Sequence, residues 1–182
     1  MVLTLYKWTL DRYHEAIDAG LFDDQPVELL RGDIVVMVPE REPHACYSSD
    51  AAEYLRRLLE ERAAVRETKP VTLPNASEPV PDIAIVQPPL RRYLDHHPYP
   101  ADIFWLIEYS QSTLMKDLGE KKQVYAEAGI QEYWVSDLKN SQLKVFRDLV
   151  DGAYQTELTL IQGNISPLSF PDVVIDVRRL FS

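Results

Sequence analysis

The chain has 182 residues and a formal net charge of −10, with 46% hydrophobic and 26% charged residues. A length of this order suits one domain, spanning residues 1–182, with a core large enough to fold without disulfides. The excess of acidic residues argues against broad, nonspecific nucleic-acid binding, because such binding depends on lysine and arginine neutralising phosphates.

The cysteine count and the hydropathy pattern indicate the cellular compartment in which the protein is expected. Cys46 is the only cysteine, so an internal disulfide is excluded. No apolar run approaches the roughly 20 residues of a membrane-spanning helix. Residues 1–7 lack the basic start and the long apolar core of a signal peptide. We therefore expect a protein of the reducing cytoplasm, without a membrane partner.

The first third of the chain predicts two helices on either side of a hairpin. Trp8–Ala19 has a helical pattern that ends at a glycine. Val27–Leu30 and Ile34–Val38 are expected to pair as antiparallel strands, with their turn at Gly32-Asp33. The longest helical pattern spans Pro43–Arg62, where apolar residues recur at spacings of three and four.

The middle of the chain predicts three strands, a long loop and a helix. Val71–Leu73 and Ile83–Val86 are short apolar strands, each bounded by proline nearby. Pro88–Pro100 contains four prolines and is expected to be a loop. Ile103–Ser110 is the most apolar strand, and Lys116–Ala128 reads as a helix that ends at a glycine.

The last third of the chain predicts strands only. They are expected at Gln131–Ser136, Gln142–Arg147, Tyr154–Ile161 and Val173–Val177. The first two are joined by a turn near residues 139–140. Helices and strands thus interleave along the whole chain, without an internal repeat or a dividing linker. This order predicts an α/β (α+β) domain with a central mixed β-sheet flanked by helices.

Glu108 is an ionisable residue near the end of an otherwise apolar strand. Because side chains alternate between the faces of a strand, Glu108 is expected to share its face with Phe104, Leu106 and Ser110. Burying an ionised carboxylate is very costly unless a cation satisfies it. The simpler interpretation is a buried or edge glutamate that pairs with an arginine.

Two further charged residues stand out against an apolar pattern. Asp82 immediately precedes the strand Ile83–Val86, and it could simply lie at a strand end outside the core. Lys121 falls near the middle of an apolar helical stripe formed by Leu114, Leu118, Val124, Tyr125 and Ala128. A lysine in that position must either extend its amine to solvent or meet an anion inside the protein.

Together the three charged residues indicate a more specific site. Asp82 and Glu108, at the ends of neighbouring strands, could bind a divalent metal such as Mg²⁺, which takes one or two carboxylates and keeps several waters. Lys121 could hold the attacking water or stabilise charge on a phosphate. A metal adds Lewis acidity and lowers the pKa of bound water. This set of groups suffices for phosphodiester hydrolysis.

The sequence resembles the PD-(D/E)XK superfamily of nucleases, which have a restriction-endonuclease-like fold. The motifs that carry the resemblance are Pro81-Asp82 and Glu108-Tyr109-Ser110. The superfamily places a lysine where this chain has Ser110. One branch carries that lysine on the following helix, and Lys121 stands at the matching position.

That branch is a large bacterial family of restriction-endonuclease-like proteins, and the resemblance covers nearly the whole domain. The similar segments are VELLRGDIV (27–35), PDIAIV (81–86), LIEYSQSTLMKDLGEKKQVYAEAGIQEYWVSDL (106–138) and SFPDVVIDVRRLF (169–181). The resemblance implies an αβββαβ-type core, a divalent metal and a nuclease-like site. It implies supporting roles for Glu28 and His44, although each could also be an ordinary structural residue. Ser110 is expected beside the site.

Three hypotheses about function follow. The first is a nuclease dependent on Mg²⁺ (or Mn²⁺) that acts on nucleic acid, expected to be DNA, with Asp82, Glu108 and Lys121 as its catalytic residues. The second is a catalytically weak or inactive nuclease-fold protein that acts through binding or oligomeric assembly. The third keeps only a structural ion pair between Lys121 and one of the carboxylates. We expect a homodimer, as in many nucleases that cut duplexes.

Overall fold

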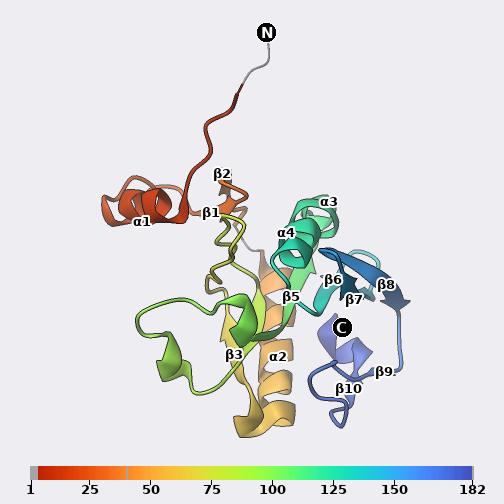
Figure 1. The fold of residues 1–182 in the computed structure, drawn as a ribbon. Helices are drawn as coiled ribbons and strands as arrows, with labels where there is room; N and C mark the ends of the chain where they lie inside the picture. Colours follow the sequence, from red (N-terminus) through yellow and green to blue (C-terminus); the bar gives the residue numbers. More distant parts are fainter. Residues whose placement is uncertain (1–3, 40, 182) are drawn as a thin grey trace.

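The computed structural model describes residues 4–39 and 41–181 (Figure 1). Residues 1–3, Glu40 and Ser182 lie outside the described part. The expectation for residues 1–7 and the two ends of the predicted domain 1–182 therefore fall partly outside it as well. Within the described ranges, no helix is both long and apolar enough to cross a membrane.

A six-stranded mixed sheet forms the centre of the molecule, in the order β3-β4-β5-β6-β7-β8. β5 and β6 run parallel, and the other neighbours in this sheet run antiparallel. The strands are β3 (Ala64–Glu67), β4 (Ile83–Val86), β5 (Ile103–Ser110), β6 (Tyr133–Asp137), β7 (Gln142–Val150) and β8 (Ala153–Leu160).

Helical segments cover both faces of this sheet. α2 precedes β3, and a helical segment joins the parallel strands β5 and β6, so the core has the order αβββαβ. This arrangement confirms the predicted α/β (α+β) fold with a mixed sheet between helices. The helices are α1 (Leu10–Asp18), α2 (Glu42–Leu59), α3 (Leu114–Lys116), the π-helical η4 (Asp117–Lys121) and α4 (Lys122–Glu127).

Short elements complete the fold around the sheet. A two-stranded hairpin, β1 and β2, precedes α2, and a second small pair, β9 and β10, lies near the C-terminus. The remaining elements are β1 (Val27–Leu30), β2 (Asp33–Val36), β9 (Asn164–Ile165), β10 (Ile175–Asp176) and the 3₁₀ turns η1 (Glu60–Arg62), η2 (Leu90–Tyr93), η3 (Pro100–Asp102) and η5 (Val177–Leu180).

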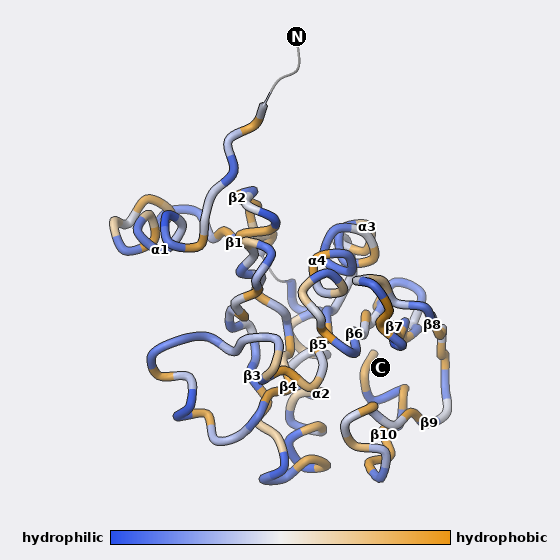
Figure 2. Tube along the Cα trace, viewed as in Figure 1, coloured by the Kyte–Doolittle hydropathy of each residue, from blue (hydrophilic) through white to orange (hydrophobic). Residues whose placement is uncertain are grey.

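Two apolar clusters hold the layers together, one on each face of the sheet. α2 and the C-terminal segment cover the face that carries Trp105, Ile107 and Tyr109. α4 packs on the opposite face, around Leu106. Figure 2 shows hydrophobic residues concentrated along the central strands, whereas α1 and α2 alternate between hydrophobic and hydrophilic residues. Because side chains alternate along β5, this strand contributes residues to both cores.

The alternation predicted for β5 fails at one residue. Phe104 packs with the first cluster, beside Phe170 at 4.9 Å between ring centroids, and not on the face of Leu106. The β4–β5 register shifts between Ile85 and Val86, which pair with Trp105 and residue 103. Such an irregularity re-aims the side chain next to it. The predicted row is therefore correct only from Leu106 onward.

The hairpin turn lies one residue earlier than predicted. Leu30 pairs with Asp33, so the two loop residues are Arg31 and Gly32, and Asp33 belongs to the strand. Both loop residues have positive φ, at 49° and 77°. Two-residue hairpins favour this backbone, because its twist matches that of the strands. The tight turn fixes the register that points Glu28 inward.

The sequence prediction was wrong at two strands in the middle of the chain. Val71–Leu73 forms no regular strand and contributes only an isolated bridge between Leu73 and Ser77. Prolines 70, 74 and 79 surround it and cannot donate to a ladder. The edge strand β3 was missed, because its four residues follow a helix directly and include two charged side chains.

Other predicted elements exist with shifted ends. Thr9 caps α1 by accepting a hydrogen bond from the Arg12 backbone N–H at 3.3 Å, so the helix begins after the predicted Trp8. The 88–100 loop contains two 3₁₀ turns. Of the predicted strand Val173–Val177, only Ile175–Asp176 is extended and paired.

A buried ion pair ties the C-terminal segment to the sheet. Glu132 is fully buried, and its carboxylate accepts hydrogen bonds from Trp134 Nε1, Arg147 Nε and the Leu168 backbone N–H, each at 2.7 Å. Arg147 Nη2 donates to the Ser166 carbonyl at 2.6 Å. One carboxylate therefore joins β6, β7 and the segment that closes the first core.

We predict that Glu132→Ala lowers the free energy of unfolding by about 3–5 kcal/mol, because it leaves the Arg147 guanidinium buried without its partner. Urea denaturation monitored by tryptophan fluorescence measures this. The matched control is Glu157→Ala, whose exposed carboxylate lies 3.4 Å from Lys144 Nζ and should contribute less than about 1 kcal/mol. Equal losses in the two variants would contradict the role of Glu132.

Candidate active site

Asp82 and Glu108 lie side by side on neighbouring antiparallel strands. Ile83 pairs with Ile107, which places Asp82 across from Glu108 at the end of the ladder. Asp82 Oδ2 accepts a hydrogen bond from the Tyr109 backbone N–H at 2.6 Å. Side chains paired in this way are about 5 Å apart at Cβ. The structure thus brings the two predicted carboxylates together.

Glu108 is buried and meets two donors through one oxygen. Its Oε1 accepts hydrogen bonds from Lys121 Nζ at 2.8 Å and from Tyr125 Oη at 2.7 Å. Its Oε2 accepts no hydrogen bond from the residues that the structure describes. Burial raises the pKa of Glu108 to about 8, and the negative charge of Asp82 adds to this rise although Lys121 opposes it.

Lys121 is a buried cation that several carboxylates surround. Its Nζ lies 2.8 Å from Glu108 Oε1 and 3.4 Å from Glu28 Oε2. Burial alone would lower the pKa of the ammonium group, but attraction to Glu108, Glu28 and further carboxylates outweighs it and raises the pKa. The amine therefore stays charged at neutral pH. It does not extend to solvent but meets anions inside the protein, which is the second of the two alternatives for this residue.

Glu28 reaches the same cluster from β1. Lys116 Nζ lies 2.5 Å from its Oε1, and the Val80 backbone N–H donates to its Oε2 at 3.1 Å. Burial favours the neutral acid, yet the charges of Lys121 and Lys116 outweigh it and lower the pKa of Glu28. Glu28 is therefore an ionised carboxylate that positions both lysines.

A π-helical turn explains how two lysines five residues apart reach one carboxylate. The predicted regular helix Lys116–Ala128 is in fact broken by η4, in which backbone bonds span five residues. In a regular α-helix Lys116 and Lys121 would point about 140° apart. The wider turn brings both ammonium groups to Glu28. Such π turns are rare and often occur at functional sites.

His44 and Ser110 occupy different parts of the cluster. His44, at the start of α2, has its Nε2 3.0 Å from Asp82 Oδ1. Ser110 is fully buried, and its hydroxyl makes no hydrogen bond to Glu108. Its hydroxyl donates to Asp117 Oδ2 at 2.5 Å, and Thr113 Oγ1 donates to the same oxygen at 2.7 Å. Burial raises the pKa of Asp117 against the attraction of Lys121.

Three residues of the cluster were missed from the sequence. Lys116 and Asp117 were predicted only as part of the helix Lys116–Ala128, without a role in the site. Tyr125 was assigned to the apolar stripe, but its hydroxyl donates to Glu108. The spacing of five between the two lysines gives no signal for a regular helix. The tyrosine could have been found, because a buried tyrosine hydroxyl needs a polar partner.

The donor atoms suit a hard divalent cation. Glu108 Oε2 is free of hydrogen bonds from the described residues, and Asp82 lies across the ladder from it. Among these residues, no group of three or more His, Cys, Asp or Glu side chains is arranged to hold a metal. Two carboxylates remain sufficient for Mg²⁺, which completes its shell with water. The residues present therefore fit a partly hydrated ion.

A small hollow of about 340 Å³ lies at the solvent side of this cluster. Glu108 and Lys121 are almost fully buried, whereas the side chains of His44, Asp82 and Lys116 remain partly exposed, so a substrate can approach past these. The hollow is lined by Val38, Pro39, Arg41, His44, Gln111, Ser112 and Thr113. None of these described residues is acidic.

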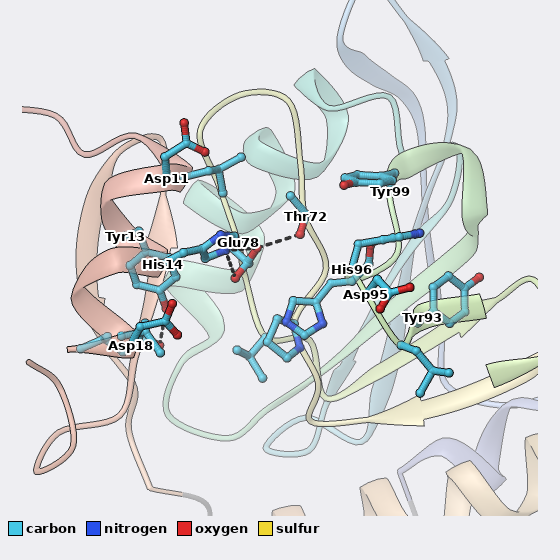
Figure 3. Close-up of a pocket in the computed structure, with 17 residues that line it drawn as sticks. Asp11, Tyr13, His14, Asp18, Thr72, Glu78, Tyr93, Asp95, His96 and Tyr99 are labelled. Atoms are coloured by element: carbon cyan, nitrogen blue, oxygen red, sulfur yellow. Dashed lines mark hydrogen bonds and ion pairs between the residues drawn. The ribbon is translucent and has the colours of Figure 1, made fainter. Parts of the chain in front are cut away.

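A larger groove of about 870 Å³ lies elsewhere, between α1 and the 93–99 loop (Figure 3). Asp11 and Asp18 line its α1 side, Asp95 lies on the loop, and Glu78 lies between them. Glu78 binds His14 Nε2 at 2.9 Å and accepts from Thr72 Oγ1 at 2.7 Å. No lysine or arginine is among its described lining residues. Its charge makes this groove unsuitable for phosphate.

Comparison with known proteins gives a consistent picture. A family model described as "Uma2: Putative restriction endonuclease" matches residues 10–178. A crystal structure of "a putative nuclease belonging to DUF820" from Anabaena variabilis ATCC 29413 superposes with a TM-score of 0.70 at 16% identity, covering 87% of this chain and 90% of that chain. At this identity the likeness shows the fold alone. A search of curated proteins gave no match.

We predict that the π turn depends on residue number and not on glycine. A Cβ at Gly119 would meet nothing within 4 Å outside its own helical turn, so Gly119→Ala should keep the cluster and stabilise the helix by about 0.5–1 kcal/mol. Deletion of Gly119 should restore a regular helix, in which Lys116 and Lys121 are four residues apart and stay on one face, about 40° from each other. Urea unfolding compares the two variants with the wild type, and a deletion variant that fails to fold would contradict the prediction.

We predict that stability falls as pH rises from about 5 to 8 in the presence of EDTA. Because the pKa of Glu108 is raised to about 8 by burial, the folded state holds a proton that the unfolded state has already lost. Each pH unit in this window then lowers the free energy of unfolding by up to about 1.4 kcal/mol. Glu108→Gln should lack this slope, and parallel curves for the two proteins would contradict the assignment.

Proposed function

Because this chain belongs to the Uma2 family, described as "Putative restriction endonuclease", we propose that it hydrolyses phosphodiester bonds of nucleic acid, with DNA as the expected substrate. The observation that carries the proposal is the buried contact between Lys121 Nζ and Glu108 Oε1 at 2.8 Å, with Asp82 on the neighbouring strand. A carboxylate pair next to a fixed cation is an arrangement that suits metal-dependent phosphodiester hydrolysis.

Asp82 and Glu108 are the proposed ligands of a divalent ion, Mg²⁺ or Mn²⁺. When bound, such an ion supplies Lewis acidity and lowers the pKa of a coordinated water. His44 and the Tyr109 backbone N–H each contact one oxygen of Asp82, so they fix the orientation of that carboxylate. Tyr125 does the same for Glu108 through its Oε1 and leaves Oε2 free to bind.

Lys121 is the proposed electrostatic catalyst. Attraction to the surrounding carboxylates raises its pKa, so the amine keeps its proton at neutral pH and cannot accept one from water. Its role is therefore to orient the attacking water or to stabilise the charge that develops on the phosphate. Glu28 forms ion pairs with both lysines of the helix and so holds this cation in place.

Two other functions compete with this proposal. A catalytically weak or inactive protein that acts through binding or assembly is favoured by the net charge of −10 and by Ser110 at the usual lysine position. A purely structural ion pair would explain the contact between Lys121 and Glu108 without any chemistry. The homodimer and the cytoplasmic location stay predictions.

We predict that the wild type cleaves DNA in the presence of Mg²⁺ or Mn²⁺, whereas Glu108→Gln and Lys121→Met lose activity by a factor on the order of 10²–10³. Gel assays with linear duplex DNA, single-stranded DNA and RNA measure the cleavage. The matched control is Glu53→Gln, which removes an exposed carboxylate of α2 that pairs with Arg57. This variant should cut like the wild type.

Further results separate the three functions. Equal cleavage by all these proteins would overturn the catalytic roles of Glu108 and Lys121. An inactive wild type that binds no Mn²⁺ at millimolar concentration by calorimetry would favour the binding or assembly function. A large loss of stability in Glu108→Gln, in a wild type that neither binds metal nor cuts, would favour the structural ion pair.

A further inference from the structure

The hollow beside Asp82 is the accessible side of the candidate active site. His44 lines this hollow and contacts Asp82 through Nε2. Thr113 lines it as well and donates to Asp117, which lies at the other end of the cluster. Gln111, which also lines the hollow, follows β5 directly and is three residues from Glu108. A molecule in the hollow therefore contacts His44 and Thr113, which bind the two ends of the catalytic cluster.

Charge separates these two hollows. The groove in Figure 3 has four carboxylates, three histidines and no lysine or arginine among its described lining residues. The small hollow has one arginine, one histidine and no carboxylate among the lining residues that the structure places. In a chain with a net charge of −10, a polyanion is repelled by most of the surface. Of these two hollows, the small one has the lining that repels a phosphate less.

Arg41 has a guanidinium that is not used inside the protein. Its side chain has no hydrogen bond, ion pair or ring contact with any residue in the ranges 4–39 and 41–181. In contrast, Arg31, Arg56 and Arg62 each pair with a carboxylate. Gln111 and Ser112 likewise make no side-chain hydrogen bond to the described residues. The hollow therefore presents a guanidinium, an amide and a hydroxyl whose donors are all available.

We propose that Arg41, assisted by Gln111 and Ser112, binds a backbone phosphate of the nucleic-acid substrate in this hollow. The inference rests on the proposed function and names the substrate contact of that same site. The planar guanidinium offers two parallel N–H donors that match two phosphate oxygens. A phosphate held there anchors the strand next to Asp82 and Glu108. Because phosphates are alike at every nucleotide, this contact positions the strand without reading its sequence.

Binding of labelled nucleic acid tests the proposal without cleavage. Fluorescence anisotropy in EDTA would use a fluorescein-labelled 20-bp DNA duplex and an RNA duplex of matched sequence, to distinguish the two sources of the phosphate. Arg41→Ala should weaken binding about tenfold and reduce the slope of log K against log salt by about 1. Arg41→Lys should fall between, since it keeps the charge but loses the two-pronged contact.

The matched control is Arg91→Ala. Arg91 is also exposed and has no side-chain partner among the described residues, but it lies in η2, in the loop beside the acidic groove. It should bind like the wild type. Equal binding by Arg41→Ala and the wild type, equal weakening by both substitutions, or no binding of either duplex by the wild type would overturn the proposal. Unchanged melting of Arg41→Ala excludes misfolding as the cause.

The two proposals fail in different ways. A wild type that binds a duplex through Arg41 but does not cut it in Mn²⁺ would remove the nuclease function and leave the phosphate site. A wild type that cuts, with unchanged anisotropy in Arg41→Ala, would keep the nuclease function and remove Arg41 from it.

Discussion

The contact between Lys121 and Glu108 is the constraint on which the rest of this site depends. Both groups are buried, and two charges in such a place are stable only when each has a partner. The positive and negative charges around this contact are nevertheless unequal in number. Four carboxyl groups and two lysines meet there: Glu28, Asp82, Glu108, Asp117, Lys116 and Lys121. Fully ionised, four negative minus two positive charges leave an excess of two, and this excess adds to burial in raising the pKa of Glu108 to about 8 although Lys121 opposes it.

The fold makes this concentration of charge possible by bringing the groups from separate elements. The end of the β4–β5 ladder fixes Asp82 beside Glu108. The two-residue hairpin turn sets the register of β1, and the Val80 backbone N–H then holds Glu28 in place. The π turn supplies both lysines from one helix. Two apolar cores lie on either side of β5 and bury these groups. The ion pairs between the carboxylates and the lysines offset the cost of that burial.

The sequence predicted those parts of the site that follow from simple periodicity. The alternation along β5 and the position of Lys121 in an apolar stripe were predicted without tertiary information. The structure confirms the alternation from Leu106 onward and the burial of Lys121. Lys116 and Asp117 could not be found in this way, because a π turn arises when tertiary contacts favour a wider helical turn over the regular one. β3 was missed and Val71–Leu73 overpredicted for a related reason. Short strands are decided by their neighbours more than by their own residues.

Ser110 shows why a lysine can leave the strand without leaving the site. A lysine there would share its strand face with Glu108. The helix provides the cation from the opposite wall instead, and position 110 then faces Asp117 at 2.5 Å in a fully buried space. A hydroxyl fits this space and donates to the carboxylate, whereas an ammonium group would compete with Lys121 for the same acids. In the proposed site, Ser110 therefore complements Lys121, because its hydroxyl binds Asp117 and leaves Glu108 to the lysine.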